Sequence, residues 1–155
     1  RAITLSGLSK SFGLPGLRIG WLATQNFDLL AKAGRIKDYT TICSSAPSEV
    51  LGVIALRARE TIVNRNVEIV RHNLDLARDF FGARPEAFEW LSPMAGPVAF
   101  PRLRLPVTAL EYAQQCLETR GAMVAPGEMF DMPGHFRVGL GRKSLGAALR
   151  ALGEQ

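Results

Sequence analysis

The sequence predicts a mixed α/β protein, and three observations lead to that prediction. Apolar runs of strand character, bounded by glycine- and proline-rich loops, occur near the start of the chain and again between residues 97 and 140. Between them, residues 45–81 place apolar side chains at helical spacing. Amphipathic stretches at 108–120 and 144–152 add further helices, so a few strands covered by helices are expected.

The first forty residues are expected to contain two strands and a short helix. Residues 1–9 form the first strand, the glycine-rich stretch from Gly13 to Gly20 forms a loop, and the apolar stretch from Ile19 to Ala23 forms the second strand. A short helix from Asn26 to Ala33 follows, because an asparagine at the start can accept a hydrogen bond from a free backbone N–H of the first turn.

The long helical stretch opens on a helix-start signal, Ser45-Ala46-Pro47-Ser48-Glu49, in which the proline suits a first turn. The stretch is too long for one ordinary helix and lacks the regularity of a coiled coil. We therefore expect two helices, or one bent helix, with the break between Glu60 and Asn64. Its apolar residues are interpreted as packing positions, namely Val50, Val53 and Ile54 on one face and Ile62, Val63, Val67, Val70, Leu74, Ala77 and Phe81 further along.

The last third of the chain is expected to contain short strands in place of long helices. After Gly82, prolines and glycines separate short extended pieces at residues 97–103, 123–125 and 136–140. A helix from Thr108 to Arg120 is expected between them, with Thr108 as its N-cap and Gly121 as its stop. Residues 144–152 form a final helix.

The composition argues against several classes of protein. The chain has 155 residues, of which 47% are hydrophobic and 21% charged, and this is typical of a globular protein with a real core. No apolar run approaches the roughly 18 residues of a membrane span. The net charge of +5 is spread along the chain without a basic run, which disfavours nucleic acid as a partner.

The cysteines and the first residues bear on the setting of the protein. Cys43 and Cys116 have no CxxC partner, so neither a metal site nor a disulfide framework is expected. Both are interpreted as small buried side chains in a reducing, cytoplasmic protein. The chain opens within a predicted strand and without an initiator Met, so we expect it to be a piece of a longer protein.

The segment from Leu8 to Trp21 holds a lysine and an arginine around a glycine-rich loop, with Lys10 eight positions before Arg18. Glycines let the backbone approach a ligand closely. A desolvated lysine is a nucleophile for carbonyl compounds, and an arginine is suited to an anionic group on the same ligand. The spacing alone also fits a surface lysine beside a common kind of turn.

The sequence of this segment closely resembles the Schiff-base segment of fold-type I pyridoxal-phosphate (PLP) enzymes, especially the class I/II aminotransferases. It reads Ser-Lys-x-x-Gly-Leu-Pro-Gly-Leu-Arg-Ile-Gly-Trp. The resemblance implies that Lys10 binds PLP covalently and that Arg18 binds the cofactor phosphate. The hydroxyl of Ser9 also matches the family pattern. Three residues before the lysine, where the family often has a phosphate-binding Ser or Thr, this chain has Gly7, so Ser6 or Ser9 is left to supply that hydroxyl.

Other stretches resemble the same family. Residues 44–48 are similar to the loop before the long interdomain helix, and residues 126–130 to a Pro-Gly-x-x-Phe segment. Residues 96–101 resemble the small-domain strand Gly-Gly-x-Phe-x-Phe-Pro, with Pro97 in place of the second glycine.

Arg137 matches the family's arginine that holds the substrate α-carboxylate. It lies in Phe136-Arg137-Val138-Gly139-Leu140-Gly141, where strand alternation points the apolar side chains one way and Arg137 the other. A planar guanidinium can give a carboxylate two parallel hydrogen bonds.

The resemblance implies both a fold and an activity. The fold would be the end of the PLP-binding large domain, residues 1–60, followed by the small C-terminal α/β domain of the aspartate-aminotransferase-like fold, residues 61–155. The activity would be transfer of an amino group between an amino acid and a 2-oxo acid by a homodimeric parent protein. The family's aspartate for the pyridine nitrogen, its stacking aromatic and its phosphate-binding turn all lie upstream of the lysine, so this piece alone is expected to be inactive.

Three alternatives stay open. Related lyases, decarboxylases and cyclases use the same lysine and arginines. A regulator with an aminotransferase-like domain would sense PLP or an amino acid. A fragment that folds without activity is the third. Nothing in the sequence selects the substrate amino acid.

Overall fold

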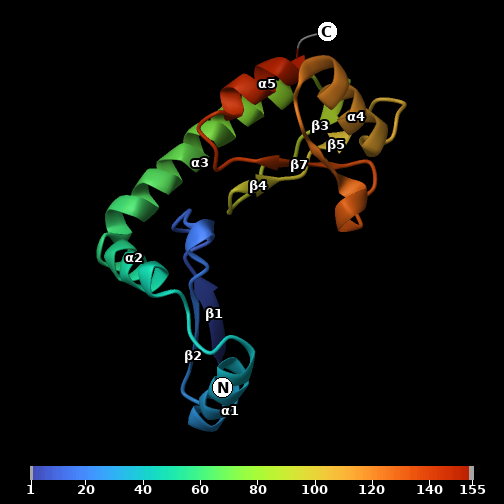
Figure 1. Cartoon of the computed structure of the whole chain (residues 1–155). Coiled ribbons are helices and arrows are strands. Elements are labelled where there is room, and N and C mark those ends of the chain that lie inside the picture. Colours follow the sequence, from blue (N-terminus) through green and yellow to red (C-terminus); the bar gives the residue numbers. More distant parts are fainter. Residues whose placement is uncertain (1, 154–155) are drawn as a thin grey trace. The chain divides into compact units, whose positions relative to one another are not determined.

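The structure is a computed structural model in which residues 2–153 are described. By their backbone contacts the residues fall into two compact units, of which the first ends at Asn66 and the second begins at Val67. Figure 1 labels most of the helices and strands of both units.

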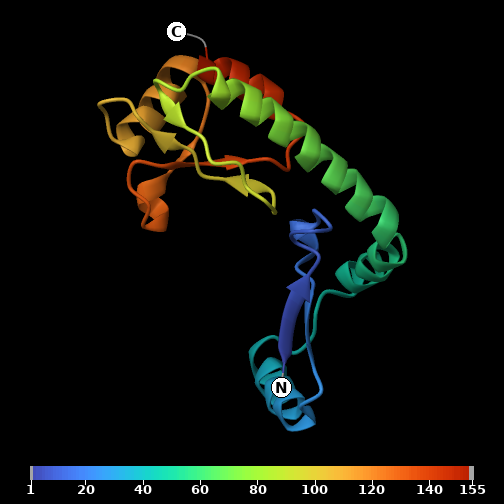
Figure 2. The same ribbon diagram turned by 180° about the vertical axis from the view of Figure 1, so that it is seen from behind.

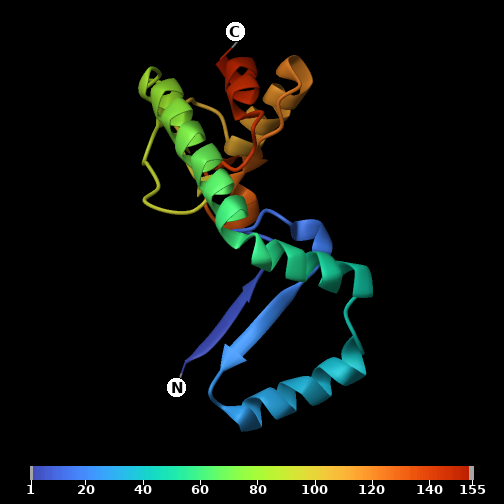
Figure 3. The same cartoon turned by 90° about the vertical axis from the view of Figure 1, so that its left-hand side faces the viewer.

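The first unit contains an antiparallel hairpin followed by helices. In chain order its elements are β1 (Ile3–Gly7), the 3₁₀ turn η1 (Pro15–Leu17), β2 (Gly20–Thr24), α1 (Phe27–Thr40), α2 (Ala46–Arg57) and the first turns of α3 (Arg59–Gly82). β1 pairs with β2 from Ile3 opposite Thr24 to Gly7 opposite Gly20, and the two arrows are side by side in Figure 3. The two predicted strands are confirmed, with slightly different ends.

Helix α1 begins where the sequence predicts. The Asn26 side chain caps it by accepting a hydrogen bond of 3.1 Å from the Leu29 N–H. Its predicted end at Ala33 is wrong, because the helix continues to Thr40. A glycine inside a helix costs only about 1 kcal/mol, so Gly34 does not stop it, and Arg35 and Lys37 beyond it are good helix formers.

The break in the long helical stretch lies earlier than predicted. It falls at Ala58, between α2 and α3, and not between Glu60 and Asn64. Ala58 has φ −92° and ψ 19°, outside the helical region, and its N–H donates to the Ile54 carbonyl. Alanine is the best helix former, so no local propensity marks this break in the sequence.

The packing face of α2 also differs from the prediction. Three residues predicted to pack, Val50, Val53 and Ile54, are exposed in the described chain. The buried residues are Gly52 and Ala55. A Cβ at Gly52 would lie 3.4 Å from Leu8 Cδ1, so the small residues let α2 approach the hairpin connection closely. Small residues carry little hydrophobic signal, which is why the sequence pattern pointed to the wrong face.

The second unit is a small α/β layer. After α3 its elements are β3 (Phe88–Glu89), β4 (Val98–Ala99), β5 (Arg102–Leu103), α4 (Ala109–Arg120), β6 (Ala125–Pro126), the 3₁₀ turn η2 (Gly127–Phe130), β7 (Phe136–Gly139) and α5 (Leu145–Gly153). β7 is the central strand of an antiparallel sheet in the order β4-β7-β6, and β3 pairs with β5. Figure 2 shows this layer from behind, with α5 alongside α3. The predicted piece at 136–140 is confirmed as β7. The piece at 97–103 divides into β4 and β5, which lie in different sheets, and the piece at 123–125 meets β6 only at Ala125. β3 was not predicted.

The core of the second unit is aromatic. The Phe81 ring lies edge-to-face with Phe88 at 5.2 Å between centroids, and Phe88 lies in the same way against Phe136 at 5.8 Å. The predicted packing stripe on α3 is confirmed in part. Ala77 and Phe81 are fully buried and Val70 and Leu74 are partly buried against the core, whereas Val67 is exposed. The aliphatic part of this core comes from β7 and α5, through Val138, Leu140, Leu145, Leu149 and Leu152.

Helix α4 is bounded as the sequence predicts. Thr108 Oγ1 accepts from the Glu111 N–H at 3.1 Å, and Glu111 Oε2 accepts from the Thr108 N–H at 2.8 Å, which completes a capping box. Gly121 ends the helix with φ +61°.

The two cysteines differ in their surroundings. Cys116 is buried, as predicted, but Cys43 is exposed. It lies in the turn after α1, next to Ile42 with φ +57°, where the chain has no core to enter. Among the described residues, no helix is long and apolar enough to cross a membrane.

Candidate active site

The last pair of the hairpin consists of two glycines, Gly7 and Gly20, and Gly7 lies three residues before Lys10. A Cβ at Gly7 would lie 2.9 Å from the Ile19 carbonyl oxygen, and a Cβ at Gly20 would lie 2.9 Å from that of Ser6. Both contacts are with backbone, which cannot move aside without breaking the strand pairing. Gly7 therefore has a structural reason to lack a side chain, and a hydroxyl at this position would not fit this hairpin.

The connection between β1 and β2 is held at its base by the buried Leu8. The Leu8 N–H donates to the Ile19 carbonyl at 3.0 Å, and the Leu14 N–H donates to the Leu8 carbonyl at 2.9 Å. The Gly13 N–H donates to the Lys10 carbonyl at 2.9 Å, which makes residues 10–13 a tight turn. Lys10 is exposed on this turn. Within residues 2–153 its ammonium group has no hydrogen-bond or ion-pair partner, and the half-buried Ser9 precedes it.

A residue far along the chain fixes the same turn. The Asn66 Nδ2 donates to the Ser11 carbonyl at 2.9 Å, across 55 positions of sequence. Its amide also lies 3.2 Å from where a Cβ at Gly13 would be. The turn that carries Lys10 is thus held by a residue outside the hairpin, at the start of α3.

Arg18 follows η1 in an uncommon conformation. Its φ is 54° and ψ 34°, in the left-handed region that arginine rarely adopts. Its Nη1 donates to the Pro15 carbonyl at 2.7 Å, which ties the side chain back over its own turn. The guanidinium is exposed, and its other donors have no partner among the described residues. Ser9, Lys10 and Arg18 thus all lie in one connection between two paired strands.

Arg137 lies in the second unit, on the central strand β7. Phe136 and Val138 are buried and Arg137 is exposed, so the predicted alternation is confirmed. Its guanidinium carbon lies 4.9 Å from the centroid of the Phe130 ring. Arg137 has no acidic partner within ion-pair distance in the described part of the chain.

The end of β7 is held by a buried amide. The Asn73 Nδ2 donates to the carbonyls of Leu140 and Arg142, both at 2.7 Å. Asn73 is 1% exposed, and it stands four positions before the buried Ala77 on α3. A polar residue on the apolar face of a helix was a signal that the sequence offered and the prediction missed.

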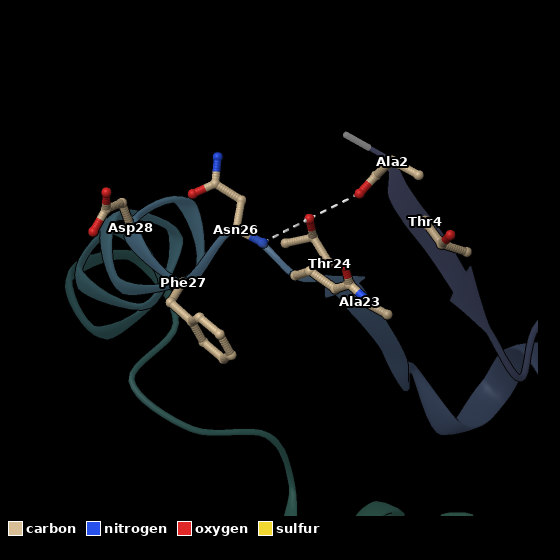
Figure 4. A pocket seen from close by; sticks show the side chains of 8 residues that line it. Ala2, Thr4, Ala23, Thr24, Asn26, Phe27 and Asp28 are labelled. Carbon is tan, nitrogen blue, oxygen red and sulfur yellow. Dashed lines mark hydrogen bonds between the residues drawn. The ribbon is translucent and has the colours of Figure 1, made fainter.

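A hollow of the first unit lies away from Lys10, at the opposite end of the hairpin. It is lined by residues of the strand ends and the start of α1 (Figure 4). Thr24 Oγ1 there donates to the Ala2 carbonyl at 2.8 Å and accepts from the Asn26 N–H at 3.2 Å. No residue singled out from the sequence for chemistry lines this hollow.

The comparisons with known proteins place the chain in a family. Residues 1–151 match the model of the family "aminotransferase class I and II". Capreomycidine synthase from Streptomyces vinaceus is 29% identical over all of this chain and 40% of that protein. The L-aspartate:5-guanidino-3-methyl-2-oxopentanoate transaminase of Pseudomonas syringae pv. syringae is 29% identical over 89% of this chain and 35% of that protein.

Solved structures agree with this result. A PLP-dependent aminotransferase from Streptococcus suis matches 97% of this chain and 40% of its own, with a TM-score of 0.87 and 27% identity. The PLP-dependent cyclase OrfR matches 97% of this chain and 42% of its own, with a TM-score of 0.88 and 28% identity. The chain spans about 40% of the length of these proteins.

The chain belongs to the aminotransferase class I and II family. Its fold is the end of the PLP-binding large domain and the small C-terminal α/β domain of the aspartate-aminotransferase-like fold, as the sequence predicted. The family implies pyridoxal 5′-phosphate as the cofactor.

Proposed function

We propose that this chain is the carboxy-terminal part of a PLP-dependent aminotransferase that moves an amino group between an amino acid and a 2-oxo acid. The observation that carries the proposal is the β1–β2 connection, which presents a lysine and an arginine on one short stretch of a chain of this family, the lysine having no partner within residues 2–153. The sites at Ser9, Lys10, Arg18 and Arg137 are part of the proposal.

The donors present fit the cofactor chemically. PLP carries an aldehyde and a phosphate, so it calls for a primary amine and for cationic or hydroxyl donors. Lys10 offers the amine, Arg18 offers guanidinium donors left over from its bond to Pro15, and Ser9 offers a hydroxyl. In this proposal Lys10 holds the aldehyde carbon, while Arg18 and Ser9 bind the phosphate.

The chain's own residues divide the work of the reaction. When bound, the cofactor serves as an electron sink for charge that develops at the substrate α-carbon. Lys10 Nζ would hold the cofactor and, when free, would act as the general base that takes the α-proton. Arg137 binds the α-carboxylate with two parallel hydrogen bonds and so decides which bond of the α-carbon is broken.

A covalent trap tests the proposal. The full-length protein is loaded with PLP, reduced with borohydride and mapped by peptide mass spectrometry. We expect a phosphopyridoxyl group on Lys10 and none after Lys10→Ala. The other three lysines of the chain, Lys32, Lys37 and Lys143, are internal controls. Labelling spread over all four lysines, or none at Lys10, would contradict the proposal.

A second candidate function is PLP-dependent cyclisation of a guanidino amino acid. It is favoured by one observation, namely that a capreomycidine synthase and a PLP-dependent cyclase are among the similar proteins, together with a transaminase whose named substrate carries a guanidino group. Cyclisation would use the same Lys10 and Arg137. It differs in the fate of the nitrogen, because no amino group leaves the substrate.

Nitrogen transfer separates the two candidates. The PLP-loaded full-length protein is incubated with L-aspartate, L-phenylalanine or L-arginine and with pyruvate as the amino acceptor. Transamination predicts alanine in an amount equal to the oxo acid formed from the donor. Consumption of a guanidino amino acid without alanine would favour the cyclase.

The setting of the whole protein is also proposed. We expect a cytoplasmic homodimer, and a division into a large-domain part at residues 1–60 and a small domain at 61–155. The homodimer is the assembly that the resemblance to the aminotransferase class I and II family implies. Sedimentation of the full-length protein tests the dimer.

A further inference from the structure

The guanidinium of Arg137 rests on an aromatic ring. Its central carbon lies 4.9 Å from the centroid of Phe130, within the roughly 6 Å of a cation–π contact. Phe130 in turn meets Phe100 edge-to-face, at 5.5 Å between centroids and 84° between planes. Arg137 therefore has a fixed aromatic surface under it and no competing anion within the described residues.

The loop that carries Phe130 is short and closed upon itself. It leaves β6 at Gly127 and returns as β7, with Ala125 on one strand opposite Arg137 on the other. The Gly127 N–H donates to the His135 carbonyl at 2.6 Å, and the Met132 N–H donates to the Gly127 carbonyl at 3.0 Å. A Cβ at Gly127 would collide with the Met132 carbonyl oxygen, so only glycine lets the loop close this tightly.

Phe130 contributes little to the core, which makes packing a poor explanation for it. It is 38% exposed, whereas Phe136 on the neighbouring strand is fully buried. A ring face offers no hydrogen-bond acceptor of ordinary strength, so a guanidinium lying on it keeps its N–H donors free in its own plane. Those are the donors that a carboxylate needs for a two-point contact.

From these contacts we infer that Phe130 is a positioning residue for Arg137, holding its guanidinium in place for the α-carboxylate of the substrate, with Phe100 fixing the tilt of the ring. The inference rests on the proposed role of Arg137. It assigns Phe130 to substrate affinity and not to the chemical step, because the ring touches the arginine and not the reacting atoms.

The test is a kinetic comparison of variants of the full-length, PLP-loaded protein. L-Aspartate, L-phenylalanine and L-arginine are the probes, and the one that wild type turns over fastest is used for all variants. We expect Phe130→Leu to raise KM about two- to fivefold, the factor that corresponds to an exposed cation–π contact, while kcat stays within about twofold. Phe130→Trp keeps an aromatic face and should restore KM. Met132→Leu, a substitution in the same loop, serves as the control and should change neither constant.

A double-mutant comparison tests the positioning role of Phe130 separately from the carboxylate site at Arg137. If Phe130 acts through Arg137, Phe130→Leu raises KM in wild type but has no further effect in an Arg137→Lys background. An unchanged KM in Phe130→Leu, or a fall in kcat alone, overturns the positioning role while Arg137→Lys still raises KM. If Arg137→Lys itself leaves KM unchanged, the carboxylate site at Arg137 is wrong and the positioning role falls with it.

Discussion

Arg18 combines a left-handed backbone with a side chain tied to its own turn by the Pro15 carbonyl. If its remaining donors bind the cofactor phosphate, the substitution Arg18→Leu should raise the dissociation constant for PLP about 10- to 100-fold, which is the range for a hydrogen bond to a charged group. Fluorescence titration of the full-length apoprotein with PLP measures this. Arg35→Leu, at an exposed arginine on α1, is the matched control. Equal dissociation constants for the two variants would remove Arg18 from the phosphate site.

Tyr112 carries a hydroxyl that the fold buries without a partner. It is 3% exposed, and its Oη has no hydrogen bond among the described residues. Burial raises the pKa of Tyr112 above its usual value, and the neighbouring Cys116 adds to the rise. Because a buried hydroxyl without a partner costs free energy, Tyr112→Phe should stabilise the protein by about 1 kcal/mol.

Urea unfolding of the 155-residue chain measures this change. Tyr39→Phe is the control, since the side chain of Tyr39 is 93% exposed in that chain and its hydroxyl stays in water. A loss of stability in Tyr112→Phe would mean that the hydroxyl has a partner after all.

At the scale of the elements, Asn73 joins helix α3 to the end of strand β7. Its amide donates to the carbonyls of Leu140 and Arg142. Asn73→Leu keeps the number and branching of the side-chain heavy atoms and removes both donors, so the free energy of unfolding should fall by about 2 kcal/mol. Urea unfolding checks this against Asn64→Leu, at an exposed asparagine of the same helix. Equal effects of the two substitutions would show that the buried amide contributes nothing particular.

The start of α4 should respond to acid. Hydrogen bonds from the Thr108 backbone and hydroxyl lower the pKa of Glu111 below its ordinary 4.5. A carboxyl with a lowered folded pKa stabilises the helix above pH 4.5, and the stabilisation is lost as the pH falls through the folded value. The protection factors of the amides in the first turn of α4, which are exchange rates relative to the intrinsic rate at each pH, should therefore fall below about pH 4.5 in wild type. In Glu111→Gln, whose side chain does not titrate, that step should be absent, and its persistence would rule out Glu111 as the cause.

Local signals decide which elements the sequence could predict. Both ends of helix α4 were predicted, because the N-cap Thr108 and the terminating Gly121 are local signals that adjoin the helix in the sequence. The predicted position of the helix break was wrong, because the break at Ala58 is set by tertiary packing. The predicted packing face of α2 was also wrong, because that face uses Gly52 and Ala55. The two-residue strand β3 exists only through its pairing with β5.

The candidate site divides in the same way. Lys10, Arg18 and Arg137 were found from the sequence because they lie in motifs that resemble those of the family. Their roles stay predictions. Asn66 was not marked by the sequence, and Phe130 stood in the Pro-Gly-x-x-Phe segment without a role of its own. The contact through which each acts is created only by the fold.

At the scale of the whole chain, the two units differ in how much apolar surface they bury. Within residues 2–66 the buried apolar side chains are Leu8 and Ala55, and α1 buries none of its residues. The second unit has a continuous core that runs from Ala77 to Leu152. Stability follows the apolar area removed from water, so the units should open separately when the 155-residue chain is studied alone.

Hydrogen exchange of the isolated chain tests this difference directly. Local opening free energy depends on buried contacts, so backbone amides of β7, α4 and the second half of α3 should exchange at least about tenfold more slowly than those of α1 and the β1–β2 hairpin. The full-length protein provides the control, because covering the exposed side chains of the first unit should raise its protection towards that of the second. Uniform protection across the isolated chain would show that the first unit is stabilised by something other than its own buried surface.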